Sequence, residues 1–412
     1  MRRRVILLLL VCLVFGAGRT HVLLGQDTKP TLILISFDGF RWDYRTRYSA
    51  PNLNRLAARG VSADLIPSYP SKTFPNHYTI VTGLYPGHHG IVANTVKDLP
   101  TGRRLSMSNS AENQDAMWWG GEPIWVTVQR AGLLSASMFW VGSEAPIEGH
   151  RPNFWTPFNN SVSGAARVDR VLAWLDLPPD KRPTLMTLYI SDVDGAGHSS
   201  GPESSAVRTA VRRADDYLGR LLRGLERRHL TDTVNIVVVS DHGMAETSTN
   251  RVVVLDDYIS PDDVEVIDIN PTLGLFPRAG REEAVYKALV NAHPRLKVYK
   301  RGETPEHWHY RDHPRIPPIV GVVDEGWQVL PRATLTQRIE RGPNGPRGEH
   351  GYDPRYAKSM QGIFIAAGPA FKSGVVLPPF ENIHIYDALA RVLGVKPATN
   401  DGDPAIGGAM LK

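Results

Sequence analysis

The sequence predicts an α/β fold in which helices cover both faces of a mainly parallel sheet. Apolar runs rich in β-branched residues alternate with helix-like stretches along most of the chain, and this alternation is typical of layered α/β domains. The chain has 412 residues, of which 42% are hydrophobic, so it is long enough to bury a large core. The predicted strands are residues 31–37, 133–140, 183–190, 233–240 and 362–367. The predicted helices are residues 51–59, 165–175, 203–229 and 382–393.

The segment from about residue 250 to 345 breaks this alternation. It contains short strand-like runs such as 264–268, one helix-like stretch near 281–292, and many Pro, His and Arg residues. Polar motifs that we assign below to a single site lie on either side of it, at 241–242 and at 350. We therefore expect a small inserted subdomain beside that site, within one large domain of residues 27–412.

The first 26 residues have the pattern of a secretory signal peptide. Arginines at positions 2–4 precede the apolar run Val5–Phe15, and small residues follow at positions 16–18. This pattern predicts a secreted or periplasmic protein whose mature chain has no membrane span. An uncleaved membrane anchor is the alternative, although the apolar run is shorter than the roughly 20 residues that a span needs.

The charge and cysteine content change when this segment is removed. The whole chain has a formal net charge of +5, and residues 1–26 contain four arginines and no acidic residue, which leaves a net charge of +1. This balance provides no basic footprint for nucleic acid. The single cysteine, Cys12, lies in the same segment, so the mature chain would have no disulfide.

Acidic and histidine side chains follow several predicted strands, which is where catalytic groups gather in open α/β sheets. These side chains are Asp38 after 31–37, Asp194 and His198 after 183–190, Asp241 and His242 after 233–240, and His350 in a glycine-containing segment. Carboxylate and imidazole groups in this number suit two zinc-like ions. Taken singly, each aspartate has an alternative interpretation as a turn former or helix cap, and each histidine as a surface residue.

Residues 69–86 predict a helix that begins near a hydroxyl group. Thr73 precedes Phe74-Pro75 and an amphipathic run, so we expect Thr73 at the helix cap, where the helix dipole favours an anion. On these grounds alone, Thr73 is only a cap.

Taken together, the motifs closely resemble those of the nucleotide pyrophosphatase/phosphodiesterase family of the alkaline phosphatase superfamily. The resemblance covers roughly residues 31 to 395 and implies an alkaline-phosphatase-like sheet between helices, with an inserted subdomain. The matching motifs are Phe37-Asp38-Gly39, Pro70 to Pro86 with His89 to Asn94 behind it, Asp194 to His198, Ser240 to Met244, and His350-Gly351-Tyr352. One departure is Asp192-Val193, which stands where the family usually has Glu-Pro, so we expect the local loop to differ.

The resemblance also implies a set of residue roles. It places Asp38, Thr73, Asp241 and His242 around one zinc ion, and Asp194, His198 and His350 around the other. Thr73 would be the nucleophile, because a bound zinc ion lowers the pKa of its hydroxyl. Asn94 and the backbone amides of Thr73 and Phe74 would donate to a phosphoryl oxygen. The implied course is attack by Thr73, a covalent threonine intermediate and its hydrolysis.

Four aromatic residues fall where members of this family hold groups that receive a nucleobase. They are Phe74, Trp140, Phe158 and Tyr189. Flat rings suit this task because stacking accepts any base, although each residue has an alternative role in the core. The expected partner is a small nucleotide or other phosphodiester, cleaved at a phosphodiester or pyrophosphate bond to a nucleoside 5′-monophosphate. Choline-bearing lipid phosphodiesters are disfavoured, because the sequence places no acid among these aromatic residues.

Other functions need to be weighed against this one. A sulfatase of the same superfamily would have a Cys/Ser-x-Pro-x-Arg motif, which the segment 73–77 does not match. A phosphomonoesterase or phosphonate hydrolase would use the same metals and threonine, so the sequence leaves that alternative open. A non-enzymatic metal-binding protein is disfavoured because every expected ligand is present.

Overall fold

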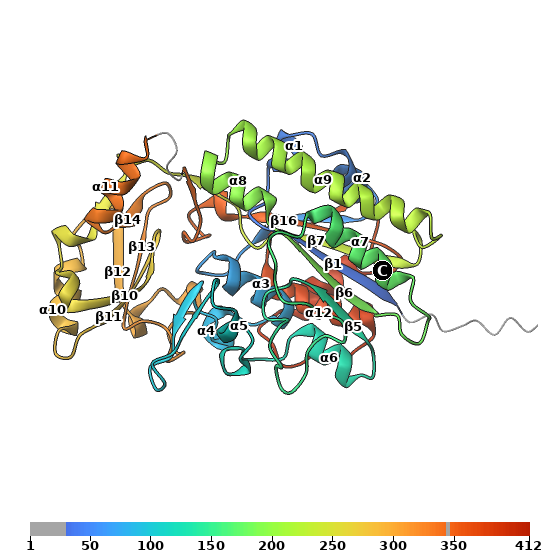
Figure 1. The fold of residues 1–412 in the computed structure, drawn as a ribbon, viewed down its shortest axis with the longest axis horizontal. Coiled ribbons are helices and arrows are strands. Elements are labelled where there is room, and N and C mark those ends of the chain that lie inside the picture. Colours follow the sequence, from blue (N-terminus) through green and yellow to red (C-terminus); the bar gives the residue numbers. More distant parts are fainter. Residues whose placement is uncertain (1–29, 343–346) are drawn as a thin grey trace, which may run out of the picture.

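A computed structural model of the chain describes residues 30–342 and 347–412. The predicted signal peptide, residues 1–26, lies outside the described residues and stays a prediction. Across the part of the chain that the structure describes, no helix is both long enough and apolar enough to cross a membrane. Figure 1 shows a large sheet between helices and a smaller sheet beside it.

The large sheet confirms the predicted α/β fold, and it contains all five predicted strands. In spatial order its strands are β17 (Val375–Val376), β2 (Val61–Ile66), β16 (Gly362–Ala367), β7 (Val234–Val239), β1 (Thr31–Phe37), β6 (Leu185–Ile190) and β5 (Ser135–Met138), and β18 (Phe380–Glu381) also pairs with β2. Every pairing is parallel except those of β16, which runs antiparallel to both β7 and β2. The sheet is therefore mainly parallel, as predicted.

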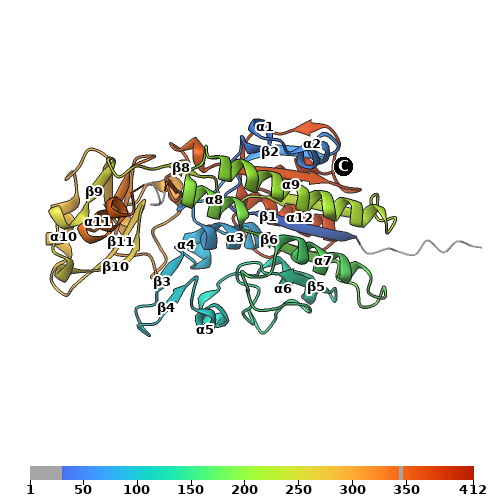
Figure 2. The ribbon, with the colours of Figure 1, turned by 45° about the horizontal axis from the view of Figure 1, so that its top comes forward.

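Helices pack on both faces of this sheet, as Figures 1 and 2 show. One face is covered by α2 (Pro51–Ala58), α7 (Gly164–Leu175) and α9 (Ser205–Glu226), and the other by α3 (Thr73–Thr82), α6 (Ile124–Arg130) and α12 (Ile385–Leu393). Successive side chains of β1 point to opposite faces, so Leu32 and Leu34 join one core while Ile33 and Ile35 join the other. Both cores exclude water, which explains why the central strands are apolar on both faces.

The smaller sheet is antiparallel and has its own core. Its strands are ordered β10 (Val264–Ile269), β11 (Thr272–Pro277), β13 (Ile319–Val323) and β12 (Leu296–Lys300). The helices α10 (Glu282–Leu289) and α11 (Arg332–Glu340) and the strand pair β9 (Val252–Val254) and β14 (Gln328–Leu330) belong to the same part of the chain. All of these elements fall between residues 250 and 345. That this segment is an inserted subdomain stays a prediction.

One edge of the large sheet positions the site. In the register of the sheet, Phe37 lies opposite Ile190 and Ser36 lies opposite Val239, so β1, β6 and β7 end at the same level. The helix α8 (Asp192–Ser200) begins directly after β6. The strand β8 (Ala245–Glu246), which follows β7 in the chain, pairs with β15 (Gly348–Glu349). The α-helices and strands not yet named are α1 (Tyr44–Arg47), α4 (Pro86–His89), β3 (Thr95–Lys97), β4 (Arg104–Ser106), α5 (Ser110–Asn113) and α13 (Pro404–Met410), and several short 3-10 helices connect the larger elements.

Candidate active site

The structure brings the predicted Asp and His residues together beside Thr73. Their possible ligand atoms form overlapping groups in which all atoms lie within 4.8 Å of one another. These groups are Asp194 with His198 and His350, Asp38 with Asp194 and His242, and Asp38 with His77 and Asp241. Segments far apart in the chain therefore meet at one edge of the large sheet.

The imidazoles of His198 and His350 face each other through lone pairs. The Nδ1 of His198 lies 2.9 Å from the carbonyl oxygen of Gly348. The Nδ1 of His350 lies 3.0 Å from the carbonyl oxygen of Ser71. A carbonyl oxygen only accepts, so each Nδ1 has a proton, and in the neutral ring Nε2 then has the lone pair. The two Nε2 atoms nevertheless lie 3.1 Å apart, and Asp194 Oδ1 lies 3.3 Å from the Nε2 atom of His198. With both rings neutral, these electron-rich atoms repel one another unless a cation lies among them. Without a metal ion, the charge of Asp194 outweighs burial and raises the pKa of His198 to about 10, so a proton takes that place.

His242 presents a further acceptor to the same space. Its Nδ1 donates to the carbonyl oxygen of Gly243 at 2.9 Å, which leaves the lone pair on Nε2. That Nε2 lies 2.9 Å from Asp241 Oδ2 and 3.4 Å from Asp38 Oδ1. Its distance to Thr73 Oγ1 is 3.2 Å. A cation held by these groups would therefore lie close to the threonine hydroxyl.

Three buried carboxylate oxygens at the centre of the site have no hydrogen-bond partner among the described residues: Asp38 Oδ1, Asp194 Oδ1 and Asp241 Oδ2. Two of these carboxylates use their other oxygen. The Tyr189 hydroxyl donates to Asp38 Oδ2 at 2.6 Å, and the Gly39 amide donates to Asp241 Oδ1 at 3.2 Å. Burying a charged acceptor without a partner is costly, whereas a metal ion satisfies it. Carboxylate oxygens and imidazole nitrogens with fixed outer partners are groups that could hold a metal ion.

The pKa values of these groups point to the same conclusion. Burial and the neighbouring carboxylates of Asp241 and Asp194 raise the pKa of Asp38 well above its ordinary value. Burial lowers the pKa of His350 well below its usual range, so this imidazole is held neutral. A metal cation would stabilise both the ionised carboxylate and the neutral imidazole.

Thr73 lies one residue inside the helix, and the prediction that it forms the cap is wrong. Lys72 is the N-cap residue of α3, and Thr73 is the first helical residue. The Thr73 hydroxyl is therefore not used to cap the helix and instead faces His242 in a buried position. At this end of the helix the backbone amides of the first turn have no partner within the helix, which favours an anion.

Asn94 lies beside Thr73, and its side chain is oriented by the backbone. Its Oδ1 accepts a hydrogen bond from the Phe74 amide at 2.9 Å. That the amides of Phe74 and Thr73 donate to a phosphoryl oxygen stays a prediction. The Asn94 Nδ2 makes no hydrogen bond within the described residues, and it is the free donor of the pair.

A pocket of about 80 Å³ opens beside Thr73 and brings all four predicted aromatic residues together. Its lining comprises Thr73, Phe74, Met107, Asn113, Trp119, Phe139, Trp140, Val141, Gly142, Glu144, Phe158 and Tyr189. Phe158 is 47% exposed at the mouth, whereas Trp140 is only 1% exposed and donates from Nε1 to the His77 carbonyl oxygen. Trp140 is thus chiefly a core residue, and Phe158 and Phe74 offer the more accessible rings.

Glu144 places an acid in this pocket, and the expectation that no acid lies among the aromatic residues is wrong. Its carboxylate accepts hydrogen bonds from the Phe158 amide at 2.8 Å and from Gln114 Nε2 at 3.1 Å. The tight turn after Trp140 returns the chain to the pocket, which sequence spacing alone does not show.

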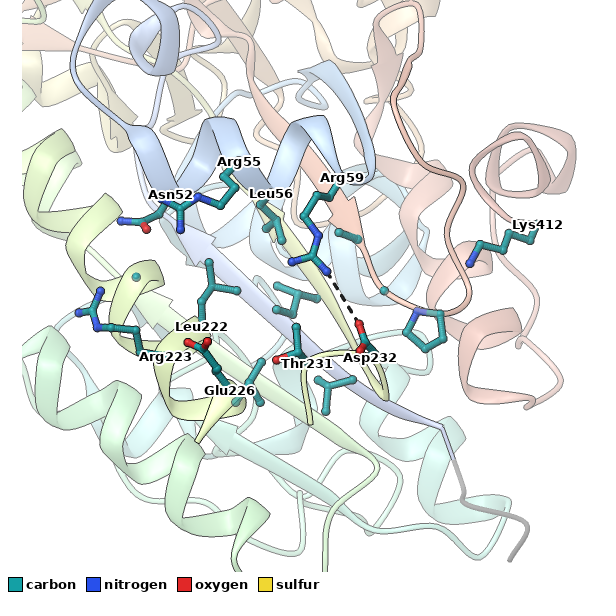
Figure 3. A pocket seen from close by; sticks show the side chains of 17 residues that line it. Asn52, Arg55, Leu56, Arg59, Leu222, Arg223, Glu226, Thr231, Asp232 and Lys412 are labelled. Atoms are coloured by element: carbon teal, nitrogen blue, oxygen red, sulfur yellow. Dashed lines mark ion pairs between the residues drawn. The ribbon is translucent and has the colours of Figure 1, made fainter. Parts of the chain in front are cut away.

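A second cavity, of about 660 Å³, lies elsewhere, between α2 and α9. Arg55, Arg59, Glu226 and Asp232 are among its lining residues (Figure 3). Because it contains Val234, the first residue of β7, it opens at the sheet edge opposite the metal-binding groups. None of the predicted site residues lines it.

Comparison with known proteins gives the family. A family model described as type I phosphodiesterase / nucleotide pyrophosphatase matches residues 32–353. The chain belongs to this family. Rat ectonucleotide pyrophosphatase/phosphodiesterase family member 3 is 38% identical over 400 residues, which cover 93% of this chain and 44% of the relative. An uncharacterized pyrophosphatase/phosphodiesterase of Schizosaccharomyces pombe is 40% identical over 386 residues, which cover 91% of this chain and 79% of the relative.

A solved structure of this family has the same fold. Murine ectonucleotide pyrophosphatase/phosphodiesterase 5 matches with a TM-score of 0.87 and 34% identity, covering 93% of this chain and 100% of the murine one. That structure is of an inactive threonine-to-alanine variant in complex with AMP. The present chain spans less than half the length of the rat relative.

His77 is a site residue that the sequence prediction missed. Its Nδ1 donates to the Thr73 carbonyl oxygen at 2.9 Å and lies 3.3 Å from Asp241 Oδ2, and its Nε2 lies 2.8 Å from Ser36 Oγ. With the proton on Nδ1, that atom is not available to a metal ion, so these contacts give His77 a supporting place beside the candidate ligands. Its position one helical turn after Thr73 was the available signal.

His198 lies on a helix and not in the loop after β6. It is the seventh residue of α8, which begins at Asp192. The four-residue spacing from Asp194 therefore places both side chains on one helical face. Asp192 itself is directed away from the metal-binding groups, toward Arg213 at 3.3 Å.

Proposed function

We propose that this chain is a two-zinc phosphodiesterase that hydrolyses nucleotide phosphodiester or pyrophosphate bonds and releases nucleoside 5′-monophosphates. One observation supports it most strongly. Unpartnered carboxylate oxygens and imidazole nitrogens cluster around His242, whose Nε2 lies 3.2 Å from the Thr73 hydroxyl, and Thr73 also lines an aromatic pocket. The AMP bound to the murine neighbour supports a nucleotide as the ligand.

Seven residues would hold the two ions. Asp38, Thr73, Asp241 and His242 would hold one, and Asp194, His198 and His350 the other. Two zinc ions would supply Lewis acidity, which lowers the pKa of a bound hydroxyl and neutralises charge on a phosphoryl group. The chain contributes the rest by fixing each ligand through an outer hydrogen bond.

Thr73 would act as the nucleophile. Its oxygen attacks phosphorus in line with the leaving group, a bond from threonine oxygen to phosphorus forms, and the bond to the leaving group breaks. Water then hydrolyses this covalent threonine intermediate. The Nδ2 of Asn94 donates to the phosphoryl oxygen that gains charge. His77 holds the Thr73 carbonyl, which fixes the backbone from which the Thr73 side-chain oxygen attacks.

The pocket would receive the nucleobase. Phe74 and Phe158 present ring faces for stacking, and the ring of Tyr189 lies 6.1 Å from that of Phe158 at a steep angle. Trp140 backs the pocket from the core. Stacking on these residues would supply binding energy remote from phosphorus, which helps to position the phosphoryl group for attack.

Glu144 favours a second candidate function. A quaternary ammonium group binds between aromatic faces and an acid, and Glu144 supplies that acid in the same pocket. A choline-bearing phosphodiesterase is therefore the alternative that the structure strengthens relative to the sequence. The two hydrogen bonds that the Glu144 carboxylate already accepts reduce its capacity to pair with a cation, so the nucleotide stays the first choice.

The test compares p-nitrophenyl thymidine 5′-phosphate, p-nitrophenyl phosphate and p-nitrophenyl phosphorylcholine in one zinc-containing buffer. We expect the thymidine diester to be the best substrate. Glu144→Gln should affect it little, but should strongly lower turnover of the choline ester if that ester is the true substrate class. A phosphomonoesterase would prefer p-nitrophenyl phosphate.

We further propose a secreted or periplasmic location, which rests on the predicted signal peptide.

A further inference from the structure

The turn between β10 and β11 of the smaller sheet contacts both flanks of the candidate active site. On one side it meets Lys72, which directly precedes the proposed nucleophile. On the other side it meets Glu349, which directly precedes His350. Residues of the smaller sheet thus reach two chain segments that supply opposite halves of the metal-binding group.

The contact with Lys72 is a buried ion pair. Lys72 is 4% exposed, and its Nζ lies 2.6 Å from Asp268 Oδ1, near the end of β10. Thr272, at the start of β11, donates to the other oxygen of Asp268. Lys72 is also the N-cap of α3, and its carbonyl oxygen accepts from the Asn76 amide at 3.1 Å and from Asn76 Nδ2 at 2.9 Å. The ion pair therefore fixes the residue from which the helix of Thr73 starts.

The contact with Glu349 is a hydrogen bond from the turn itself. Asn270 is 7% exposed, and its Nδ2 donates to Glu349 Oε2 at 2.5 Å. The other carboxylate oxygen of Glu349 lies 3.6 Å from His198 Nδ1. Asn270 has a φ of +62°, a left-handed conformation that asparagine tolerates better than most residues. Its side-chain oxygen is in turn held by the Val329 amide at 3.3 Å.

The backbone after His350 packs against the same two partners. Gly351 has a φ of +123°, and a Cβ there would lie 2.9 Å from Lys72 Cε and 3.0 Å from Pro271 Cδ. The turn, the lysine side chain and the segment after His350 are thus in close contact with no space for a methyl group. Movement of the turn would displace all three.

We propose that Asp268 and Asn270 are positioning residues for the reaction, which act by holding Lys72 and Glu349 and so place Thr73 and His350. This inference rests on the proposed function, because it takes Thr73 as the nucleophile and His350 as a metal ligand. The smaller sheet then belongs to the active site as its outer support. Pairing with Asp268 also neutralises Lys72, so the lysine does not serve as a free cation for substrate phosphate.

The test uses two substitutions and one matched control. Asp268→Asn removes the charge that holds Lys72, and Asn270→Asp keeps the size and turn preference but replaces the donor with an acceptor facing Glu349. The control is Asp263→Asn. Asp263 lies just before β10 of the same smaller sheet, and it forms a partly exposed ion pair with Arg281 at 2.7 Å.

We expect Asp268→Asn to lower kcat by about 10-fold or more for both p-nitrophenyl thymidine 5′-phosphate and p-nitrophenyl phosphate, with KM unchanged. Asn270→Asp should weaken zinc binding about 10- to 100-fold in a chelator-competition titration. Hydrogen exchange of the amides at 69–74 should accelerate in Asp268→Asn, and the control should match the wild type in every assay.

Folded variants with wild-type kcat, zinc affinity and exchange would overturn the inference. So would a change in the ratio of diester to monoester turnover at unchanged zinc affinity, because that pattern means that Lys72 acts on the phosphate directly. If Asp268→Asn does not fold, the pair Lys72→Met with Asp268→Leu removes both charges while keeping bulk, and the same drop in kcat is expected. An inactive wild type would refute the proposed function, while the zinc and exchange measurements would still test the positioning role.

Discussion

Tyr189→Phe separates two tasks of one side chain. The Tyr189 hydroxyl donates to Asp38 Oδ2 at 2.6 Å, and its ring lines the substrate pocket. Burial and the charge of Asp38 raise the pKa of Tyr189 well above its ordinary value, so the hydroxyl remains a donor at any working pH. Phenylalanine removes this donor and keeps the ring, which leaves Asp38 Oδ2 buried without its partner.

The expected cost follows from that single lost bond. A hydrogen bond to a charged group contributes about 2 kcal/mol, which corresponds to ~30-fold in zinc affinity or in kcat at limiting zinc. Both p-nitrophenyl thymidine 5′-phosphate and p-nitrophenyl phosphate should lose activity by the same factor, since Asp38 serves both. Zinc-buffered titrations of turnover provide the assay. Wild-type zinc dependence in Tyr189→Phe would refute the assignment of Asp38 as an ion ligand oriented by this hydroxyl.

Three further outcomes are expected. Thr73→Ala should remove nearly all turnover while zinc content and thermal unfolding stay close to wild type, and Thr73→Ser should retain part of the rate; near-normal kcat in the alanine variant would exclude Thr73 as the nucleophile. Chelation should abolish activity and zinc should restore it, with about two ions per chain by elemental analysis, and His350→Ala should lower the occupancy of mainly one site. Full activity after verified metal removal would contradict the need for the metal ions. Phe74→Ala should lower kcat/KM for the thymidine diester more than for p-nitrophenyl phosphate, and Phe158→Ala is a second probe at the pocket mouth. If the diester-to-monoester ratio of kcat/KM is unchanged in both variants, these rings do not stack on the substrate.

The sequence predicts the large sheet well because its signal is one of pattern. Buried strands such as 233–240 consist mostly of apolar residues, and a helix such as α9 is long and amphipathic. Strand direction has no such signal, so the antiparallel β16 could not be distinguished from its parallel neighbours. β2 was missed because its six residues include Ser62 and Asp64 and follow closely on a helix.

The grouping of the proposed metal ligands was predictable for a related reason. Most of them follow a strand or lie on a helix that begins at one edge of the sheet, so the topology brings them close together. The support around them was not predictable, because it depends on individual atoms. The Tyr189 hydroxyl reaches Asp38, the His77 imidazole reaches Thr73, and the Lys72 ammonium reaches Asp268 across 196 positions of sequence. Glu144 enters the pocket only because of a tight turn.

The most direct measurement of the proposed function is the ratio of kcat/KM for p-nitrophenyl thymidine 5′-phosphate to that for p-nitrophenyl phosphate. A monoester dianion needs an additional cation. No arginine lines the described pocket beside Thr73, and Lys72 is neutralised by Asp268. A diester has one fewer charge and a second substituent for the aromatic rings to hold. We predict a ratio of at least about 100, equivalent to ~2.7 kcal/mol of transition-state stabilisation. Equal efficiency on the two esters, or a preference for the monoester, would contradict the assignment of this chain as a phosphodiesterase.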